Sequence, residues 1–67
     1  MMVPTPIKLV SKTTSEGIEV WIEKRIEEDG PYYGVGLHYP NGVEKYWPHK
    51  KGPRGLFLAT CEFNRLV

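Results

Sequence analysis

The fold of this chain is decided by residues 18–47, which read IEVWIEKRIEEDGPYYGVGLHYPNGVEKYW. In the first part of this stretch, Val20 and Ile22 alternate with polar residues at a period of two, which indicates a strand with one buried face. A second alternating run follows, in which Tyr33, Val35 and Leu37 share a face. The stretch therefore predicts an antiparallel meander of strands joined by tight turns.

Two dipeptides that contain glycine supply the turns. Asp29-Gly30 separates the first two strands, and Asn41-Gly42, a strong hairpin signal, precedes a third strand. If both are two-residue turns, Ile22 faces Leu37 on the neighbouring strand, and Leu37 faces Tyr46 on the next one. The apolar residues then share one face in all three strands, and a slip by one residue would reverse the faces.

The segments on either side of residues 18–47 complete a single small domain. A short apolar run at 7–10 predicts an earlier strand, residues 48–55 form a basic loop rich in Gly and Pro, and residues 60–66 predict a short helix. The expected fold is α+β: a small antiparallel meander of three to four strands followed by a short C-terminal helix, over residues 1–67. A domain of this size buries only about 60 % of its unfolded surface, so we expect a homodimer.

Several classes of protein are disfavoured by composition. The chain has one cysteine, Cys61, so no disulfide is expected, and Cys61, His38 and His49 lack the spacing of metal ligands. We expect no cofactor, and no enzyme activity, because no nucleophile or carboxylate stands at a fixed spacing to either histidine. Without a secretory signal or an apolar stretch of membrane length, and with a free thiol, the expected location is the cytoplasm.

The second face of the predicted sheet carries the candidate binding residues. The two-residue turns place both tryptophans on this face, beside a trough left by Gly34 and Gly36 on the central strand. Basic side chains from the strands and from the loop at 48–55 adjoin it. The candidate set is Trp21, Arg25, His38, Lys45, Trp47, His49, Lys50, Lys51 and Arg54.

An aromatic and basic trough on an open sheet fits single-stranded DNA or RNA. Bases would stack on Trp21 and Trp47, and the cations would neutralise phosphates. Two other interpretations remain open. The face could bind a protein partner or a second copy of the chain, as a small adaptor or inhibitor does, or the indoles could simply cover the glycine backbone.

The order of motifs resembles one family of single-stranded-DNA-binding proteins. The parts follow one another in this order: a four-stranded sheet, then Pro48-His49-Lys50-Lys51-Gly52, then Gly55-Leu56-Phe57-Leu58, then Glu62-Phe63 and Leu66. This order resembles that of the transcriptional coactivator family "positive cofactor four". The resemblance implies a homodimer that regulates transcription and binds single strands across its sheet, with Trp47, Lys50 and Lys51 at contact positions. The chain departs from the family pattern by an apparent insertion at Pro53-Arg54-Gly55, and by a shorter helix.

Overall fold

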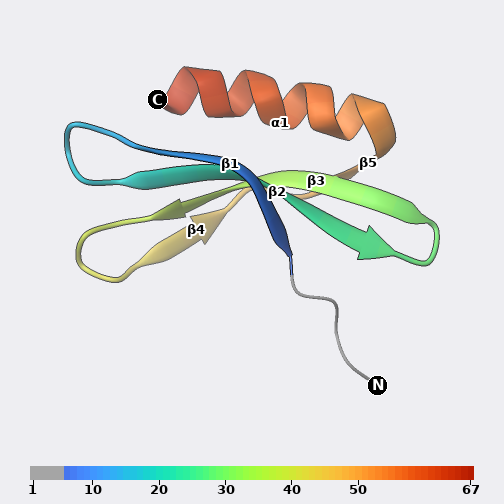
Figure 1. Cartoon of the computed structure of the whole chain (residues 1–67), viewed down its shortest axis with the longest axis horizontal. Coiled ribbons are helices and arrows are strands. Elements are labelled where there is room, and N and C mark those ends of the chain that lie inside the picture. Colours follow the sequence, from blue (N-terminus) through green and yellow to red (C-terminus); the bar gives the residue numbers. More distant parts are fainter. Residues whose placement is uncertain (1–5) are drawn as a thin grey trace.

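The computed structural model describes residues 6–67 as a twisted antiparallel sheet with one helix lying along one side of it (Figure 1). The strands are β1 (Ile7–Thr13), β2 (Glu19–Glu27), β3 (Gly30–His38), β4 (Glu44–Tyr46) and β5 (Lys50–Lys51), and the helix is α1 (Gly52–Leu66). The sheet order is β1-β2-β3-β4, and β5 pairs with the other end of β3. The expected α+β class, a meander followed by a helix, is confirmed.

The core lies between the sheet and α1. Val20, Ile22, Val35 and Leu37 form the sheet layer of the core, as the period-two alternation predicts, and Ala59 and Phe63 of α1 cover them. We call α1 together with the sheet face beneath it the helix side, and the opposite sheet face the open face. Residues paired across neighbouring strands point to the same face, so the strand register assigns each side chain to one of the two.

The register between β2 and β3 keeps the predicted faces, but the predicted partners are wrong by two residues. Ile22 pairs with Val35, not with Leu37, and the ladder continues to Glu27 opposite Gly30. Gly30, with φ of 127°, therefore begins β3 and does not form part of a two-residue turn. A shift of two residues leaves every side chain on its expected face, because the side-chain period of a strand is two.

The register between β3 and β4 differs from the prediction by one residue, which reverses the faces of β4. Leu37 pairs with Lys45, so Lys45 lies on the helix side and Tyr46, opposite Gly36, lies on the open face. The cause is a three-residue loop in place of a two-residue turn. Tyr39 N–H donates to the Val43 carbonyl at 2.8 Å, and Gly42, with φ of 90°, takes the left-handed position that such loops require.

Helix α1 begins eight residues before its predicted start at residue 60, inside the segment expected to be a loop. Gly-Pro sequences suggest loops, but proline is well suited to the first turn of a helix, and Pro53 occupies that position. Gly55 lets the helix start against β5: a Cβ atom there would lie 2.0 Å from the Lys50 carbonyl oxygen. The apparent insertion at Pro53-Arg54-Gly55 is therefore the first turn of α1.

Candidate functional site

The two tryptophans lie on opposite sides of the sheet, so the predicted stacking pair is wrong. Trp21 lies on the open face opposite Gly36, whereas Trp47 packs against the core cluster on the helix side. Trp47 was expected on the open face because the β3–β4 loop was assumed to hold two residues. Tyr46 takes that place, with its ring edge-on to Trp21 at a centroid distance of 6.1 Å.

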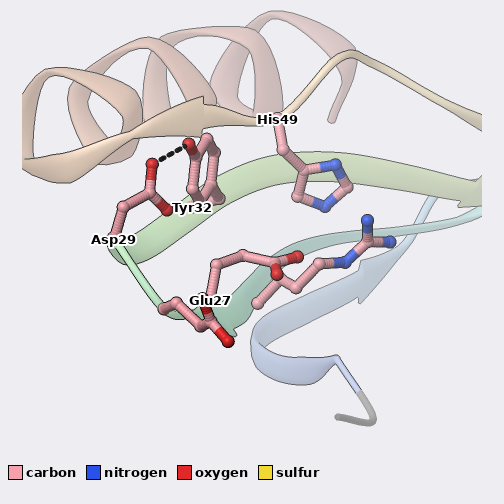
Figure 2. Close-up of a pocket in the computed structure, with 6 residues that line it drawn as sticks. Glu27, Asp29, Tyr32 and His49 are labelled. Carbon is pink, nitrogen blue, oxygen red and sulfur yellow. Dashed lines mark hydrogen bonds between the residues drawn. The ribbon is translucent and has the colours of Figure 1, made fainter. Parts of the chain in front are cut away.

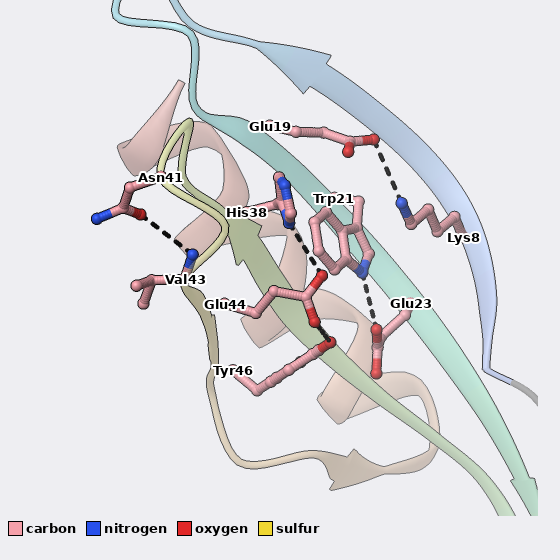
Figure 3. Close-up of polar contacts among 9 residues, drawn as sticks. All are labelled: Lys8, Glu19, Trp21, Glu23, His38, Asn41, Val43, Glu44 and Tyr46. Atoms are coloured by element: carbon pink, nitrogen blue, oxygen red, sulfur yellow. Dashed lines mark hydrogen bonds and ion pairs between the residues drawn. The ribbon is translucent and has the colours of Figure 1, made fainter.

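Trp21 covers the glycine backbone and is itself covered. Its side chain is only 3 % exposed, and a Cβ on Gly36 would lie 2.5 Å from the indole ring. The Lys8 ammonium lies above the ring at 4.1 Å from the centroid and also pairs with Glu19 at 3.3 Å (Figure 3). A ring enclosed in this way has no free face on which a nucleic-acid base could stack.

A buried carboxylate links the Trp21 indole to His49. Glu23 lies on the open face and is buried; its Oε1 accepts from Trp21 Nε1 at 2.8 Å (Figure 3). Its Oε2 lies 2.7 Å from His49 Nε2. His49 lies over Gly34, where a Cβ would come within 2.8 Å of its ring. The trough predicted over Gly34 and Gly36 is therefore filled by an imidazole and an indole.

A second polar group on the open face lies at the end of β3. His38 Nδ1 is 3.0 Å from Glu44, and the Tyr46 hydroxyl donates to the other oxygen of the same carboxylate at 2.8 Å (Figure 3). These contacts hold the pKa of Glu44 below its usual range, with the Tyr46 hydrogen bond as the larger cause. The same hydrogen bond to Glu44 raises the pKa of Tyr46. The carboxylate of Glu44 thus already has its partners within the chain.

An open cleft of about 670 Å³ lies where β2 turns into β3 (Figure 2). The Tyr32 hydroxyl donates to Asp29 at 2.8 Å, which lowers the pKa of Asp29 and raises that of Tyr32. Lys51 pairs with Asp29 at 3.6 Å. The lining residues are Arg25, Glu27, Glu28, Asp29, Tyr32 and His49, so carboxylates predominate over cations there. This balance disfavours phosphate.

The nine candidate residues do not form one surface. Trp21, Arg25, His38, His49 and Lys51 lie on or adjoin the open face; Lys45, Trp47 and Lys50 lie on the helix side; and Arg54 is in the first turn of α1. Of the five on the open face, Trp21, His38, His49 and Lys51 contact acidic side chains within the chain. The predicted basic face is therefore divided between two sides.

Charge is distributed unevenly between the two sides. The open face bears three Lys or Arg side chains, Lys8, Arg25 and Lys51, beside five carboxylates, those of Glu19, Glu23, Glu27, Asp29 and Glu44. The helix side bears six of the nine Lys and Arg residues, Lys12, Lys24, Lys45, Lys50, Arg54 and Arg65. The carboxylate on α1 is Glu62, and it already pairs with Arg65. The helix side is thus the basic side of the domain.

Large apolar side chains are also exposed beside these cations. On β1, Ile7 is 51 % and Val10 46 % exposed, and on α1 Leu56 is 37 % and Phe57 66 % exposed. Sequence reasoning missed Leu56 and Phe57 because it placed the start of α1 too late. It missed Lys12 because the strand was expected to end at Val10. A helix extended back to Pro53 would have placed Phe57 on the outer surface.

No family model matches the chain, and no curated protein and no solved structure matches it either. Among residues 6–67, no three His, Cys, Asp or Glu side chains gather as a metal ion would require. None of the helices in that range combines the length and the apolar character needed to cross a membrane.

Proposed function

We propose that this domain is a non-catalytic protein-interaction module that binds its partner through the helix side. The observation that carries the proposal is the mixture of exposed apolar and cationic side chains there. Ile7, Val10 and Leu56 are each more than a third exposed, and Lys12 and Lys24 share their side of the sheet. Exposed apolar residues with a polar rim are typical of protein contacts.

The open face supports this function less well. Its charged groups already pair with one another, as Lys8 does with Glu19 and His38 with Glu44. Its indole is enclosed, and its glycines are covered. A partner docking there would have to displace these contacts before forming its own, which lowers the net gain on binding.

Site-specific photo-crosslinking in cells tests the proposal. A benzophenone amino acid at Leu56 should crosslink to another protein on irradiation, because that side chain is exposed on the helix side. The same amino acid at Thr13, which is exposed and pairs with Glu19 on the open face, is the matched control and should not crosslink. Equal crosslinking from both positions, or none from either, would refute the proposal.

A second candidate function, binding of single-stranded nucleic acid, is supported by the start of α1. Lys50 and Lys51 directly precede the helix and Arg54 lies in its first turn, which contains no acidic residue and has no side-chain cap. Helix N-termini attract anions, and three cations beside one would attract phosphates. This candidate ranks second because the indoles expected to stack on bases lie under α1 and under Lys8.

A calorimetric titration with a single-stranded oligonucleotide at two salt concentrations tests the second candidate. Binding should weaken as salt rises, and Lys50→Ala with Lys51→Ala should flatten the dependence by about two phosphate contacts. Trp47→Phe should leave the affinity unchanged if phosphates alone are contacted. Heat that does not depend on salt, or on either lysine, would exclude contact at this corner.

A further inference from the structure

The helix side has a part that α1 does not cover. Among residues 6–67, α1 packs against β2, β3 and β5 but not against β1. Leu58 and Glu62 line a cleft with Trp47 and Pro48, so that flank of α1 is directed toward β4. At 100° per residue, Leu56 and Thr60 lie on the opposite flank, toward β2 and β1. The space above β1 is therefore open.

This open space has an apolar floor and wall. Ile7 pairs with Lys24 and Val10 with Ile22, so these two side chains of β1 are directed to the helix side, and both are about half exposed. Leu56 forms the wall on α1. We call this surface the α1–β1 shelf and define it by Ile7, Val10 and Leu56, with Lys12 and Lys24.

Both lysines of the α1–β1 shelf are cations without an ion pair among residues 6–67. Lys12 pairs across the strands with Val20, and Lys24 with Ile7, so each stands beside an apolar residue of the helix side. Two unneutralised cations on the rim of an apolar surface favour a partner that carries carboxylates on either side of an apolar stripe.

We infer that the α1–β1 shelf binds an acidic amphipathic helix of a partner protein; this rests on the proposed interaction function. The shelf lies over β1, the outer strand of the sheet, beside α1. A second helix beside α1 would complete the layer over the sheet. Its apolar stripe packs on Ile7, Val10 and Leu56, and its carboxylates meet Lys12 and Lys24.

A second copy of this chain does not fit the α1–β1 shelf equally well. Its only α-helix among residues 6–67 is α1, which carries Arg54 and Arg65 and a single carboxylate, Glu62, paired with Arg65. Placing α1 of another copy on the shelf would bring Arg54 toward Lys12 or Lys24. Like charges in contact oppose such a dimer, so the partner helix is acidic and comes from a different protein.

Calorimetry with a designed peptide tests the inference on the full chain. The probe is an 18-residue helical peptide with a leucine stripe flanked by glutamates, and its control is a scrambled peptide of the same composition. We expect the ordered peptide to bind at least tenfold more tightly than the scrambled one. Lys12→Glu with Lys24→Glu should weaken it by about tenfold, since two rim ion pairs are reversed.

The matched control is Lys45→Glu with Lys50→Glu, which makes the same change in net charge on the other flank of α1. It should change the affinity by less than about threefold. A peptide with lysine in place of each glutamate should recover binding to the Lys12→Glu, Lys24→Glu chain. Equal weakening by the two double variants, or equal binding of the scrambled peptide, would overturn the inference.

Two further measurements separate the remaining outcomes. When the peptide is added to the unaltered chain, amide chemical-shift changes should map to β1, Lys24 and the Leu56 flank of α1. Changes on the open face would overturn the inference, and this test does not depend on whether a variant folds. Tighter binding of a single-stranded oligonucleotide, weakened alike by both double variants, would assign the surface to nucleic acid. If the peptide fails while Leu56 still crosslinks to a protein, the acidic helix is wrong and the interaction function stands.

Discussion

Gly36 is the residue that allows Trp21 to lie flat on the open face. Any Cβ at this position would lie 2.5 Å from the indole, which is closer than real side-chain contacts allow. Because Trp21 is enclosed by Lys8 and Tyr46 as well, the ring has little room to move away. The position therefore needs glycine for close packing, and not for a special backbone angle.

Gly36→Ala should lower the free energy of unfolding by about 1–3 kcal/mol, because overpacking forces the indole off its rotamer. Urea unfolding followed by circular dichroism measures the loss. Ser11→Ala, at an exposed position that also pairs with Trp21, is the control and should stay within about 0.5 kcal/mol. An unchanged midpoint in Gly36→Ala would mean that the ring can shift freely.

Glu23 and His49 should be energetically coupled, since their side chains meet at 2.7 Å in a nearly buried site. In a double-mutant cycle with Glu23→Ala and His49→Ala, we expect a coupling of roughly 1–3 kcal/mol. Removing either residue alone leaves the other without its partner, so the second removal should be less damaging than the first. Additive losses would show that the contact contributes nothing.

The hydrogen bond from Tyr46 lowers the pKa of Glu44, so Tyr46→Phe should raise it. Because the folded-state pKa lies below the unfolded one, this carboxylate stabilises the fold above its unfolded pKa, and the contribution disappears as pH falls through the folded pKa. Carboxyl carbon shifts recorded over a pH series measure the change. Tyr32→Phe is the control: it should raise the pKa of Asp29 and leave that of Glu44 alone.

At the level of elements, α1 contributes to the core through one face only. Gly55, Ala59 and Phe63 lie one turn apart along this face, and all three are buried. Two phenylalanines of the same helix therefore have very different environments. Phe63 is 8 % exposed and contacts the sheet core, whereas Phe57 is 66 % exposed on the outer surface.

Phe63→Ala should destabilise the domain by about 3–5 kcal/mol, because it leaves a cavity between α1 and the sheet. Phe57→Ala removes the same side chain from an exposed position and should stay within about 1 kcal/mol. Thermal unfolding of the two variants in parallel gives the comparison. Similar losses in both would mean that Phe57 is covered in solution, as it would be in a self-associated state.

The meander, its faces in β2 and β3, and the sheet half of the core could all be predicted from the sequence. The buried residues of these strands alternate with polar ones, and this alternation predicts which side chains are buried: Val20, Ile22, Val35 and Leu37. A shift of two residues in the strand pairing does not change the predicted faces. The face of β4 could not be predicted, because Pro40-Asn41-Gly42 is compatible with loops of two or three residues. Because the loop has three residues and not two, Trp47 and Lys45 lie on the helix side.

The candidate site was less predictable, because it depends on long-range packing. One interpretation of the sequence was that the indoles cover the glycine backbone. The close contact between Trp21 and Gly36 agrees with this interpretation. The α1–β1 shelf exists because α1 does not extend over β1. The position of α1 over the sheet cannot be predicted from a local sequence pattern. Alternation and turn motifs describe neighbours along the chain and across one turn, not the position of a later helix.

For the molecule as a whole, the uneven charge distribution makes the expected self-association dependent on salt. Exposed apolar side chains on the helix side favour contact between two copies, but six cations on the same side oppose it. The homodimer expected from the chain's length stays a prediction, and we expect it to form more readily as salt rises. Light scattering at two salt concentrations over a hundredfold dilution measures this. A mass independent of salt and dilution would contradict it.

The separation of the two tryptophans gives each layer of the molecule its own fluorophore. Trp21, hydrogen-bonded to Glu23 beneath Lys8, responds to its surroundings on the open face, and Trp47 to the contact between β3 and α1. Trp21→Phe and Trp47→Phe chains would each retain a single emitter. The emission of each could then be followed during stopped-flow refolding, to learn whether the sheet forms its open face before or after the helix docks. A chain of this size thus allows the two layers to be timed separately without an attached dye.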